Sequence, residues 1–144
     1  MPISFMELEL LEPRGNVVIV PTDGPVVFDT VVATEGANIG YDPGTGTVTL
    51  IEPGFYYIDW YVAPQFGLTT DGSNWAIRTA IGGLEFIGSS HSKVSVTTGF
   101  AIMNVAAGET FQLVNVSNGA IYLSEAVQCK AGIVVYNVAE QFTS

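Results

Sequence analysis

Few side chains in this sequence are of a kind that performs catalysis or binds a transition metal. His91 is the only histidine of the 144 residues, and it stands in the polar stretch Gly88-Ser89-Ser90-His91-Ser92. A site with several histidine ligands therefore cannot be built within one chain. A Ser-His-acid triad would have to use His91 as its base, and a histidine in such a stretch is more often a solvated loop residue. The sequence predicts no catalytic residue.

The carboxylates are scattered singly over expected turns and show no spacing that would suit acid-base chemistry. Acidic residues in such positions commonly fold back on the local backbone or face solvent. We interpret seven of them in this way: Asp23, Glu35, Asp42, Glu52, Asp71, Glu109 and Glu125. Asn115-Val116-Ser117 matches the N-glycosylation acceptor pattern, but it lies where a strand is expected to enter a turn, and such matches arise by chance.

Cys129 is the only cysteine, which excludes an intramolecular disulfide and a cysteine-rich metal site. It stands between Gln128 and Lys130, at the start of the last expected strand. A single cysteine in that position is more often a buried structural thiol than a reactive one. The sequence thus favours a structural role for Cys129.

Charge is sparse and strongly negative. Fourteen acidic residues face four basic ones, Arg14, Arg78, Lys93 and Lys130, for a net charge of −10. Nucleic-acid binding needs clustered lysine and arginine, so we expect no nucleic-acid partner, and attraction to an anionic membrane is disfavoured for the same reason. No apolar run approaches the ~18 residues that a membrane span needs, and residues 1–5 lack the basic and apolar regions of a signal peptide. We expect one domain with a substantial core, because 48% of residues are hydrophobic.

The most informative element is the strand expected at residues 55–62. It follows the turn Tyr41 to Gly46, a strand at 47–51 and the turn Glu52-Pro53-Gly54. Its first face carries Tyr56, Ile58, Trp60 and Val62, and its second face carries Phe55, Tyr57 and Tyr61, interrupted only by Asp59. An antiparallel sheet usually keeps one wet face. Two apolar faces indicate that the second one meets another subunit, or else that a loop of the same chain covers it.

The remaining segments read as short strands separated by turns. We expect strands near residues 16–20, 26–32, 74–81, 84–87, 93–105, 110–116, 120–124 and 132–138, with a long loop at 63–73. Residues 6–12 form an acidic and apolar segment that suits either a short strand or a turn or two of helix. Ten or so strands without a convincing helix predict an all-β sandwich or jelly roll.

Several of these motifs, in their order, resemble the C1q and tumour-necrosis-factor superfamily. The turn Tyr41-Asp42 with Thr45-Gly46, the step Pro53-Gly54 before Tyr56-Tyr57, Ala107-Gly108-Glu109, and the closing strand Ala131 to Tyr136 carry the resemblance. It covers residues 25–138 and is greatest for the C-terminal heads of bacterial collagen-like spore-surface (exosporium) glycoproteins. No collagen-like Gly-X-Y repeat precedes this head. The division it implies is a lead-in at 1–24, a jelly-roll domain at 25–138 and a tail at 139–144.

The resemblance implies a ten-stranded jelly-roll sandwich of two antiparallel sheets that forms a homotrimer. One sheet would lie on the threefold axis, and its outward face would form the interface. The residues so placed are Phe55, Tyr57, Asp59, Tyr61, Lys130, Val134 and Tyr136, with Asp59 and Lys130 as a candidate ion pair. Some heads of this family bind calcium, for which Asp71 would be the first candidate, although we expect no cofactor.

Together these observations predict a non-enzymatic homotrimeric head domain, presented on a bacterial spore or cell surface and therefore extracellular. Two other hypotheses stay open. One is a module of the same fold that binds a receptor, or a carbohydrate through exposed aromatic residues such as Trp75 and Tyr122. The other is an enzyme of unrecognised type.

Overall fold

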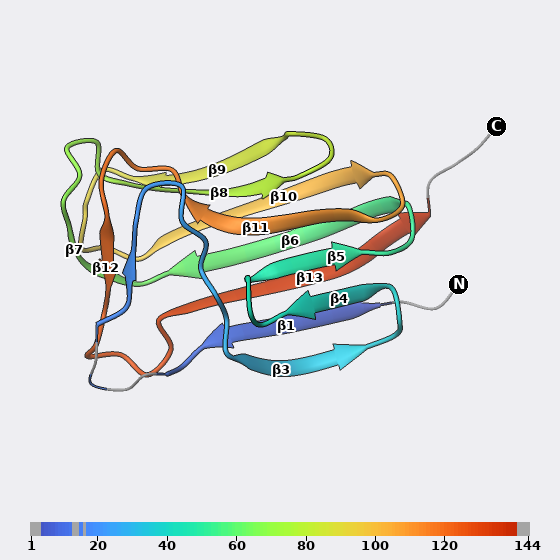
Figure 1. Cartoon of the computed structure of the whole chain (residues 1–144), viewed down its shortest axis with the longest axis horizontal. Coiled ribbons are helices and arrows are strands. Elements are labelled where there is room, and N and C mark those ends of the chain that lie inside the picture. Colours follow the sequence, from blue (N-terminus) through green and yellow to red (C-terminus); the bar gives the residue numbers. More distant parts are fainter. Residues whose placement is uncertain (1–3, 13–14, 16, 141–144) are drawn as a thin grey trace.

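The computed structural model describes residues 4–12, 15 and 17–140, and this part of the chain consists of β-strands joined by turns and loops (Figure 1). The strands are β1 (Phe5–Leu10), β2 (Ile19–Val20), β3 (Thr30–Glu35), β4 (Ile39–Asp42), β5 (Thr47–Leu50), β6 (Gly54–Val62), β7 (Pro64–Gly67), β8 (Ser73–Thr79), β9 (Glu85–Ser90), β10 (Thr97–Val105), β11 (Glu109–Asn115), β12 (Ile121–Leu123) and β13 (Ala131–Glu140). Over the same residues, no helix long and apolar enough to cross a membrane is found. The predicted all-β class is confirmed.

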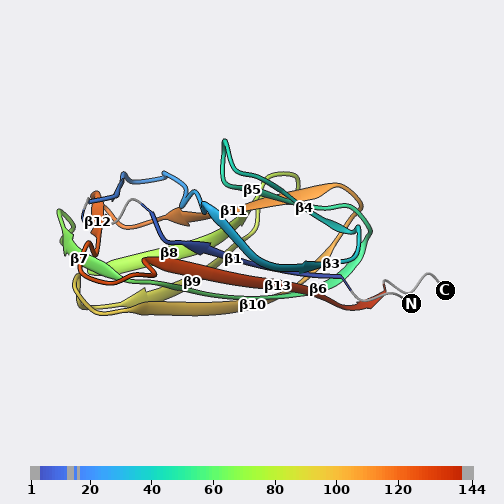
Figure 2. The same ribbon diagram turned by 90° about the horizontal axis from the view of Figure 1, so that it is seen from below.

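Two five-stranded antiparallel sheets form the sandwich. Sheet A has the strand order β10-β6-β13-β1-β3, and sheet C has the order β4-β5-β11-β8-β9. In Figure 2, β4, β5 and β11 of sheet C lie above β13, β6 and β10 of sheet A, whereas β8 and β9 of sheet C overlap sheet A in this view. Sheet B, a three-stranded sheet of order β2-β12-β7, lies across one end of the molecule (Figure 1). This is the predicted jelly-roll sandwich, with strands beyond the ten that we expected.

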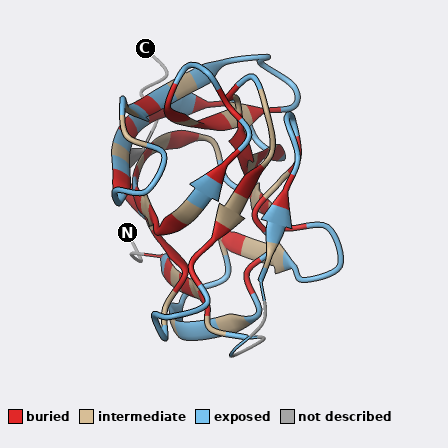
Figure 3. Ribbon diagram, turned by 90° about the vertical axis from the view of Figure 1, so that its left-hand side faces the viewer, coloured by how far each residue is buried: buried red, intermediate tan, exposed pale blue. Residues whose placement is uncertain are grey.

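Strand β6 shows the predicted alternation. It pairs with β10 along one side and with β13 along the other, in second place within sheet A. Its inward side chains are those of Tyr56, Ile58, Trp60 and Val62, and each is at most 1% exposed. Inward residues of both sheets form one core, which Figure 3 shows as the buried interior between exposed outer surfaces. The other side chains of β6 therefore stand on the outer face of sheet A.

The N-terminal segment expected as a lead-in contributes strands to the domain. Residues 5–10 form β1, which pairs with β13 on one side and with β3 on the other. Met6, Leu8 and Leu10 point into the core, whereas Glu7 and Glu9 alternate with them on the outer face. The alternation of acidic and apolar residues is thus a strand pattern of period two. Of the two structures expected for this segment, a short strand or a helix, the strand is the one that forms.

Residues 26–32 differ from the prediction of a single strand. Strand β3 begins only at Thr30, and the residues before it pair with the second half of β11: the amide of Asp23 donates to the carbonyl of Asn115, and that of Val26 to the carbonyl of Leu113, both at 2.7 Å. Strand β5 pairs only with the first half of β11, at 109–111. Residues 23–26 therefore take the place beside β11 that β5 leaves open.

Two further segments also depart from the sequence prediction. The long loop expected at 63–73 contains β7, which pairs with β12 in sheet B. The strand expected from residue 93 begins at Thr97. In β10 the inward residues are Ala101, Met103 and Val105, so the larger side chains of Phe100 and Ile102 face outward.

The side chain of Glu109 links the turn between β8 and β9 to the start of β11 through hydrogen bonds. Its buried carboxylate accepts hydrogen bonds from the backbone amides of Ile81 and Gly82, each at 2.9 Å, and from its neighbour Thr110 at 2.9 Å. Burial alone would raise the pKa of Glu109, but these backbone donors outweigh it, and the pKa is lowered. The carboxylate is therefore a structural acceptor, and it is not the solvated turn residue that we expected.

Candidate functional site: the outer face of sheet A

Side chains on the outer face of sheet A stand in rows that run across four strands. Because paired residues in neighbouring antiparallel strands point to the same side, the strand register defines these rows. Read from β1 through β13 and β6 to β10, they are Phe5, Tyr136, Tyr57 and Ile102; Glu7, Val134, Asp59 and Phe100; and Glu9, Gly132, Tyr61 and Thr98. Residues far apart in the sequence thus form one continuous surface.

This surface exposes large apolar side chains. Phe100 is 71% exposed and Ile102 is 60% exposed on β10, the edge strand, while Tyr136 and Phe5 are 38% and 37% exposed further across the sheet. The rings of Tyr57 and Tyr136 lie 5.1 Å apart between centroids. A contiguous apolar surface on a soluble domain commonly marks an interaction site. The outer face of sheet A is accordingly the candidate functional site.

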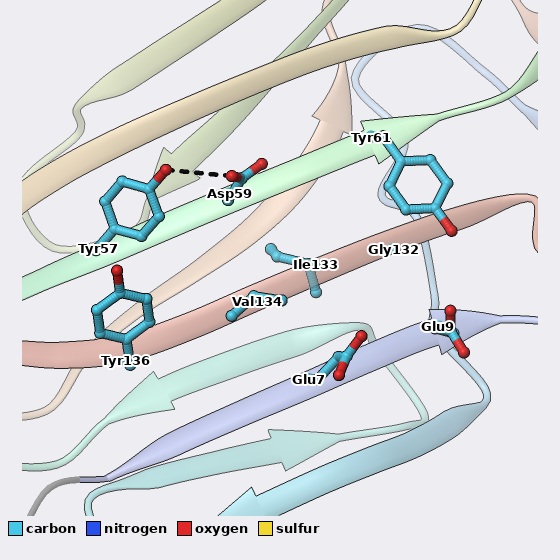
Figure 4. A pocket seen from close by; sticks show the side chains of 9 residues that line it. All are labelled: Glu7, Glu9, Tyr57, Asp59, Tyr61, Gly132, Ile133, Val134 and Tyr136. Atoms are coloured by element: carbon cyan, nitrogen blue, oxygen red, sulfur yellow. Dashed lines mark hydrogen bonds between the residues drawn. The ribbon is translucent and has the colours of Figure 1, made fainter.

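A shallow hollow of about 370 Å³ lies at the centre of this face, over β1, β13 and β6 (Figure 4). Its rim carries the carboxylates of Glu7, Glu9 and Asp59 and the hydroxyls of three tyrosines. The Tyr57 hydroxyl donates to Asp59 Oδ2 at 3.1 Å. Burial and the nearby Asp59 carboxylate raise the pKa of Tyr57, so this hydroxyl keeps its proton and acts as a donor.

Cys129 contacts two of the residues that line the hollow. Its Sγ lies 2.6 Å from the Tyr61 hydroxyl and 3.3 Å from Glu9 Oε2. Burial, reinforced by the Glu9 carboxylate, raises the pKa of the Cys129 thiol, and a raised pKa disfavours the nucleophilic thiolate. The thiol is only partly buried, in contrast to our expectation, but its contacts are those of a structural residue.

The absence of a side chain at Gly132 leaves room for the Tyr61 ring on the outer face of sheet A. A Cβ at residue 132 would lie 2.6 Å from Tyr61 Cε1, so the tyrosine ring rests on the bare backbone of β13. From there its hydroxyl reaches Cys129. Any side chain at position 132 would displace the ring, which makes this glycine part of the shape of the hollow.

Six of the seven residues predicted for an interface lie together on this face. They are Phe55, Tyr57, Asp59 and Tyr61 of β6 and Val134 and Tyr136 of β13. Their contact with another subunit stays a prediction. Five neighbours were missed: Phe5, Glu7, Glu9, Phe100 and Ile102. Period-two alternation in β1 and β10 was the available signal, but it does not say which strands lie beside β6.

The prediction for Lys130 was wrong. Its side chain is fully buried within its own chain, and its Nζ has no hydrogen-bond partner among the described residues. Asp59 is exposed and bonds to Tyr57, so the expected ion pair between Asp59 and Lys130 is not formed. Lys130 precedes β13, which begins at Ala131, and the alternation of that strand does not extend back to it.

The residues considered for other functions lie elsewhere. Trp75 is fully buried and donates from Nε1 to Ser73 Oγ at 2.8 Å, so it is not the exposed ring that the alternative hypothesis of carbohydrate binding named. Tyr122 is partly exposed on sheet B. Asp71 accepts a hydrogen bond from the Asn118 amide at 3.2 Å, His91 is exposed in a loop, and no group of three or more potential metal ligands occurs within the described part of the chain.

Solved structures share this fold, although the sequence itself matches no protein-family model and no curated protein. The globular domain of zebrafish complement 1qA protein has a TM-score of 0.65 and 14% identity, covering 98% of this chain and 100% of that chain. The crystal structure of murine APRIL at pH 8.5 has a TM-score of 0.66 and 12% identity, with coverages of 95% and 100%.

Eiger TNF from S. frugiperda has a TM-score of 0.61 and 16% identity, with 99% of this chain and 97% of that chain covered. These likenesses confirm the C1q and TNF-type jelly-roll fold. They extend over almost the whole chain, including β1 and β2 before residue 25. The spore-surface part of the sequence resemblance stays a prediction.

Proposed function

We propose that this protein is a non-enzymatic head domain of the C1q and TNF type, and that it forms a homotrimer through the outer face of sheet A. The observation that carries the proposal is the continuous apolar surface across β1, β13, β6 and β10. On this face tyrosines, valines and phenylalanines occupy positions that stay wet in an ordinary two-layer sandwich. The occupant that we propose is a second and a third copy of the same chain.

The loop before β10 also exposes apolar side chains. Val94 and Val96 in this loop are 63% and 57% exposed, and the loop leads into β10, the strand that carries the outward Phe100 and Ile102. A face and an adjoining edge of the same chain can join in a heterologous contact, which closes into a ring when the rotation allows it. Obligate interfaces of this kind are large and apolar, which matches the residues exposed here.

A binding role also agrees with the chemistry at the hollow. The Cys129 thiol is held between Tyr61 and Glu9 with a raised pKa, and the hydroxyls point along the face to neighbouring side chains. His91 stands apart in the loop between β9 and β10. We place the domain outside the cell, on a bacterial spore or cell surface, where it would drive trimer formation and present a surface. The sequence resemblance and the sparse charge support this placement.

The test is the mass of the native particle, measured by light scattering on a sizing column over a range of dilutions. We expect three times the 15.3 kDa of one chain. The double variant Phe100→Asn, Ile102→Asn should dissociate to monomers, because it removes two apolar side chains from the edge of the face. The matched control is Leu68→Asn, Ile81→Asn, which changes two residues of similar exposure, 59% and 68%, away from sheet A.

The control should remain trimeric with an unchanged circular dichroism spectrum. A wild-type protein that stays monomeric at high concentration would refute the proposal. Dissociation of the control together with the face variant would refute the assignment of the interface to sheet A.

A second candidate function, carbohydrate binding, is favoured by a row of exposed side chains on sheet B. Ile19, Tyr122 and Phe66 are neighbours across its three strands, and the rings of Phe66 and Tyr122 meet edge to face with centroids 5.4 Å apart. Such a platform suits stacking against a sugar ring. A glycan array in which Tyr122→Ala abolishes binding would support this function, and no binding by the wild type would exclude it for the sugars displayed.

A further inference from the structure

The outer face of sheet A carries three carboxylates among its apolar side chains. Glu7 lies opposite Val134, which in turn lies opposite Asp59, and Glu9 lies opposite Gly132 one row further along. All three line the central hollow (Figure 4). Any molecule that covers the tyrosines also covers these acids and removes their water.

The groups that face these carboxylates are neutral or acidic. Asp59 accepts a hydrogen bond from the Tyr57 hydroxyl, and Glu9 lies against the Cys129 thiol, itself bonded to Tyr61. From the adjoining strands, Tyr136 of β13 and Glu35 of β3 lie beside Phe5 at the start of β1, whereas β10 contributes no ionisable side chain. Among the described residues, no lysine, arginine or histidine forms an ion pair with Glu7, Glu9 or Asp59.

The chain has almost no basic side chain to bring to this face from a neighbouring copy. Arg78 pairs with Asp23 and Glu85 on sheet C. Lys130 is fully buried. Of the four basic residues, only Lys93, in the loop between β9 and β10, and Arg14, outside the described residues, are left. Two basic side chains per copy cannot neutralise three carboxylates per copy.

We propose that self-association through the outer face of sheet A takes up protons, so that the assembly tightens as the pH falls below neutrality. This inference rests on the proposed function. A carboxylate that loses water without gaining a cation is strongly destabilised, and binding a proton removes that cost.

The dependence of assembly on pH is steep, because each of the three chains of a trimer takes up protons when the trimer forms. If one carboxylate per chain binds a proton on assembly, the association constant changes with the third power of the proton concentration. For a monomer–trimer equilibrium, the chain concentration at half assembly then falls about thirtyfold for each pH unit at the steepest point. At a pH well above the range in which the carboxylates bind protons, they stay charged in both the monomer and the trimer. The association constant then no longer changes with pH.

The experiment measures the concentration of half assembly by sedimentation equilibrium at pH 5 to 8 and at constant ionic strength. It compares the wild type with two double variants that remove the same amount of charge. Glu7→Gln, Asp59→Asn changes the face, and Glu52→Gln, Glu125→Gln changes exposed residues outside it. The second variant accounts for the general repulsion between chains of net charge −10.

We expect the face variant to assemble at pH 8 at least tenfold more tightly than the wild type and to lose most of its pH dependence. The control variant should keep the steep dependence of the wild type. A wild-type trimer whose half-assembly concentration does not change with pH would overturn the inference alone, as would equal behaviour of the two variants. A monomer at every pH would instead overturn the proposed function, and this inference with it.

Discussion

Replacement of Lys130 by methionine should stabilise the fold. The lysine side chain is fully buried, and its Nζ has no hydrogen-bond partner among the described residues. Methionine keeps an unbranched apolar stem of similar length and removes the amine, so the packing is largely retained. Replacing buried charged groups by apolar residues of similar volume often stabilises a protein by about 1–4 kcal/mol. We expect an increase of about 2 kcal/mol in the free energy of unfolding.

This increase corresponds to a rise of about 4–8 °C in Tm for a domain of this size. The assay is thermal and urea unfolding followed by circular dichroism, at one fixed protein concentration because assembly shifts the apparent stability. Lys93→Met is the matched control, since it removes a lysine that is exposed, and it should change the free energy of unfolding by no more than about 0.5 kcal/mol. A loss of more than about 1 kcal/mol in Lys130→Met, with the control unchanged, would show that the amine is satisfied and would refute the reasoning.

Two other substitutions test the packing and the turns. Glu109→Gln should cost about 1–3 kcal/mol at pH 7, because a charged acceptor of backbone amides is lost. The folded-state pKa of Glu109 lies below its ordinary value of 4.5, so its contribution to stability is present above that pH and is lost as the pH falls through the folded-state pKa. The urea unfolding curves of the variant and the wild type should therefore converge in acid. Gly99→Ala should destabilise the sandwich by more than about 1 kcal/mol in the same assay, because a Cβ there would meet the buried ring of Trp60, and an unchanged Tm would contradict this packing.

The strand pattern predicted the core better than it predicted the surface. Tyr56, Ile58 and Trp60 all point inward, because alternation within one strand fixes which residues share a side. The same pattern in β10 was ambiguous, since both of its faces are apolar, and the structure buries Ala101 and Met103 while it exposes the larger Phe100. Residue size therefore does not identify the buried face when both faces are apolar.

The site could be predicted only in part, because it combines strands that are distant in the sequence. Six of its residues were predicted from the resemblance to the C1q and tumour-necrosis-factor superfamily, combined with the alternation of two strands, β6 and β13. Glu7 and Glu9 join them only because β1 lies beside β13 in sheet A, and no local signal reports that pairing. Lys130 was misplaced for another reason: it was chosen as a cation that could pair with Asp59, and no sequence pattern showed that its own side chain is buried.

The antiparallel pairing of β1 and β13 also determines how the domain would respond to a pulling force. Phe5 lies opposite Tyr136, so the start of β1 and the end of β13 are at the same end of the sheet. A force applied between these two points would act across the strands and would break their hydrogen bonds one after another. Strands loaded in this way separate at low force, because only one hydrogen bond carries the load at a time. A force applied at opposite ends of the two strands would instead load all of their hydrogen bonds at once. A domain held from both ends of its chain would therefore open first at this pair, in the middle of the sheet that we propose as the interface.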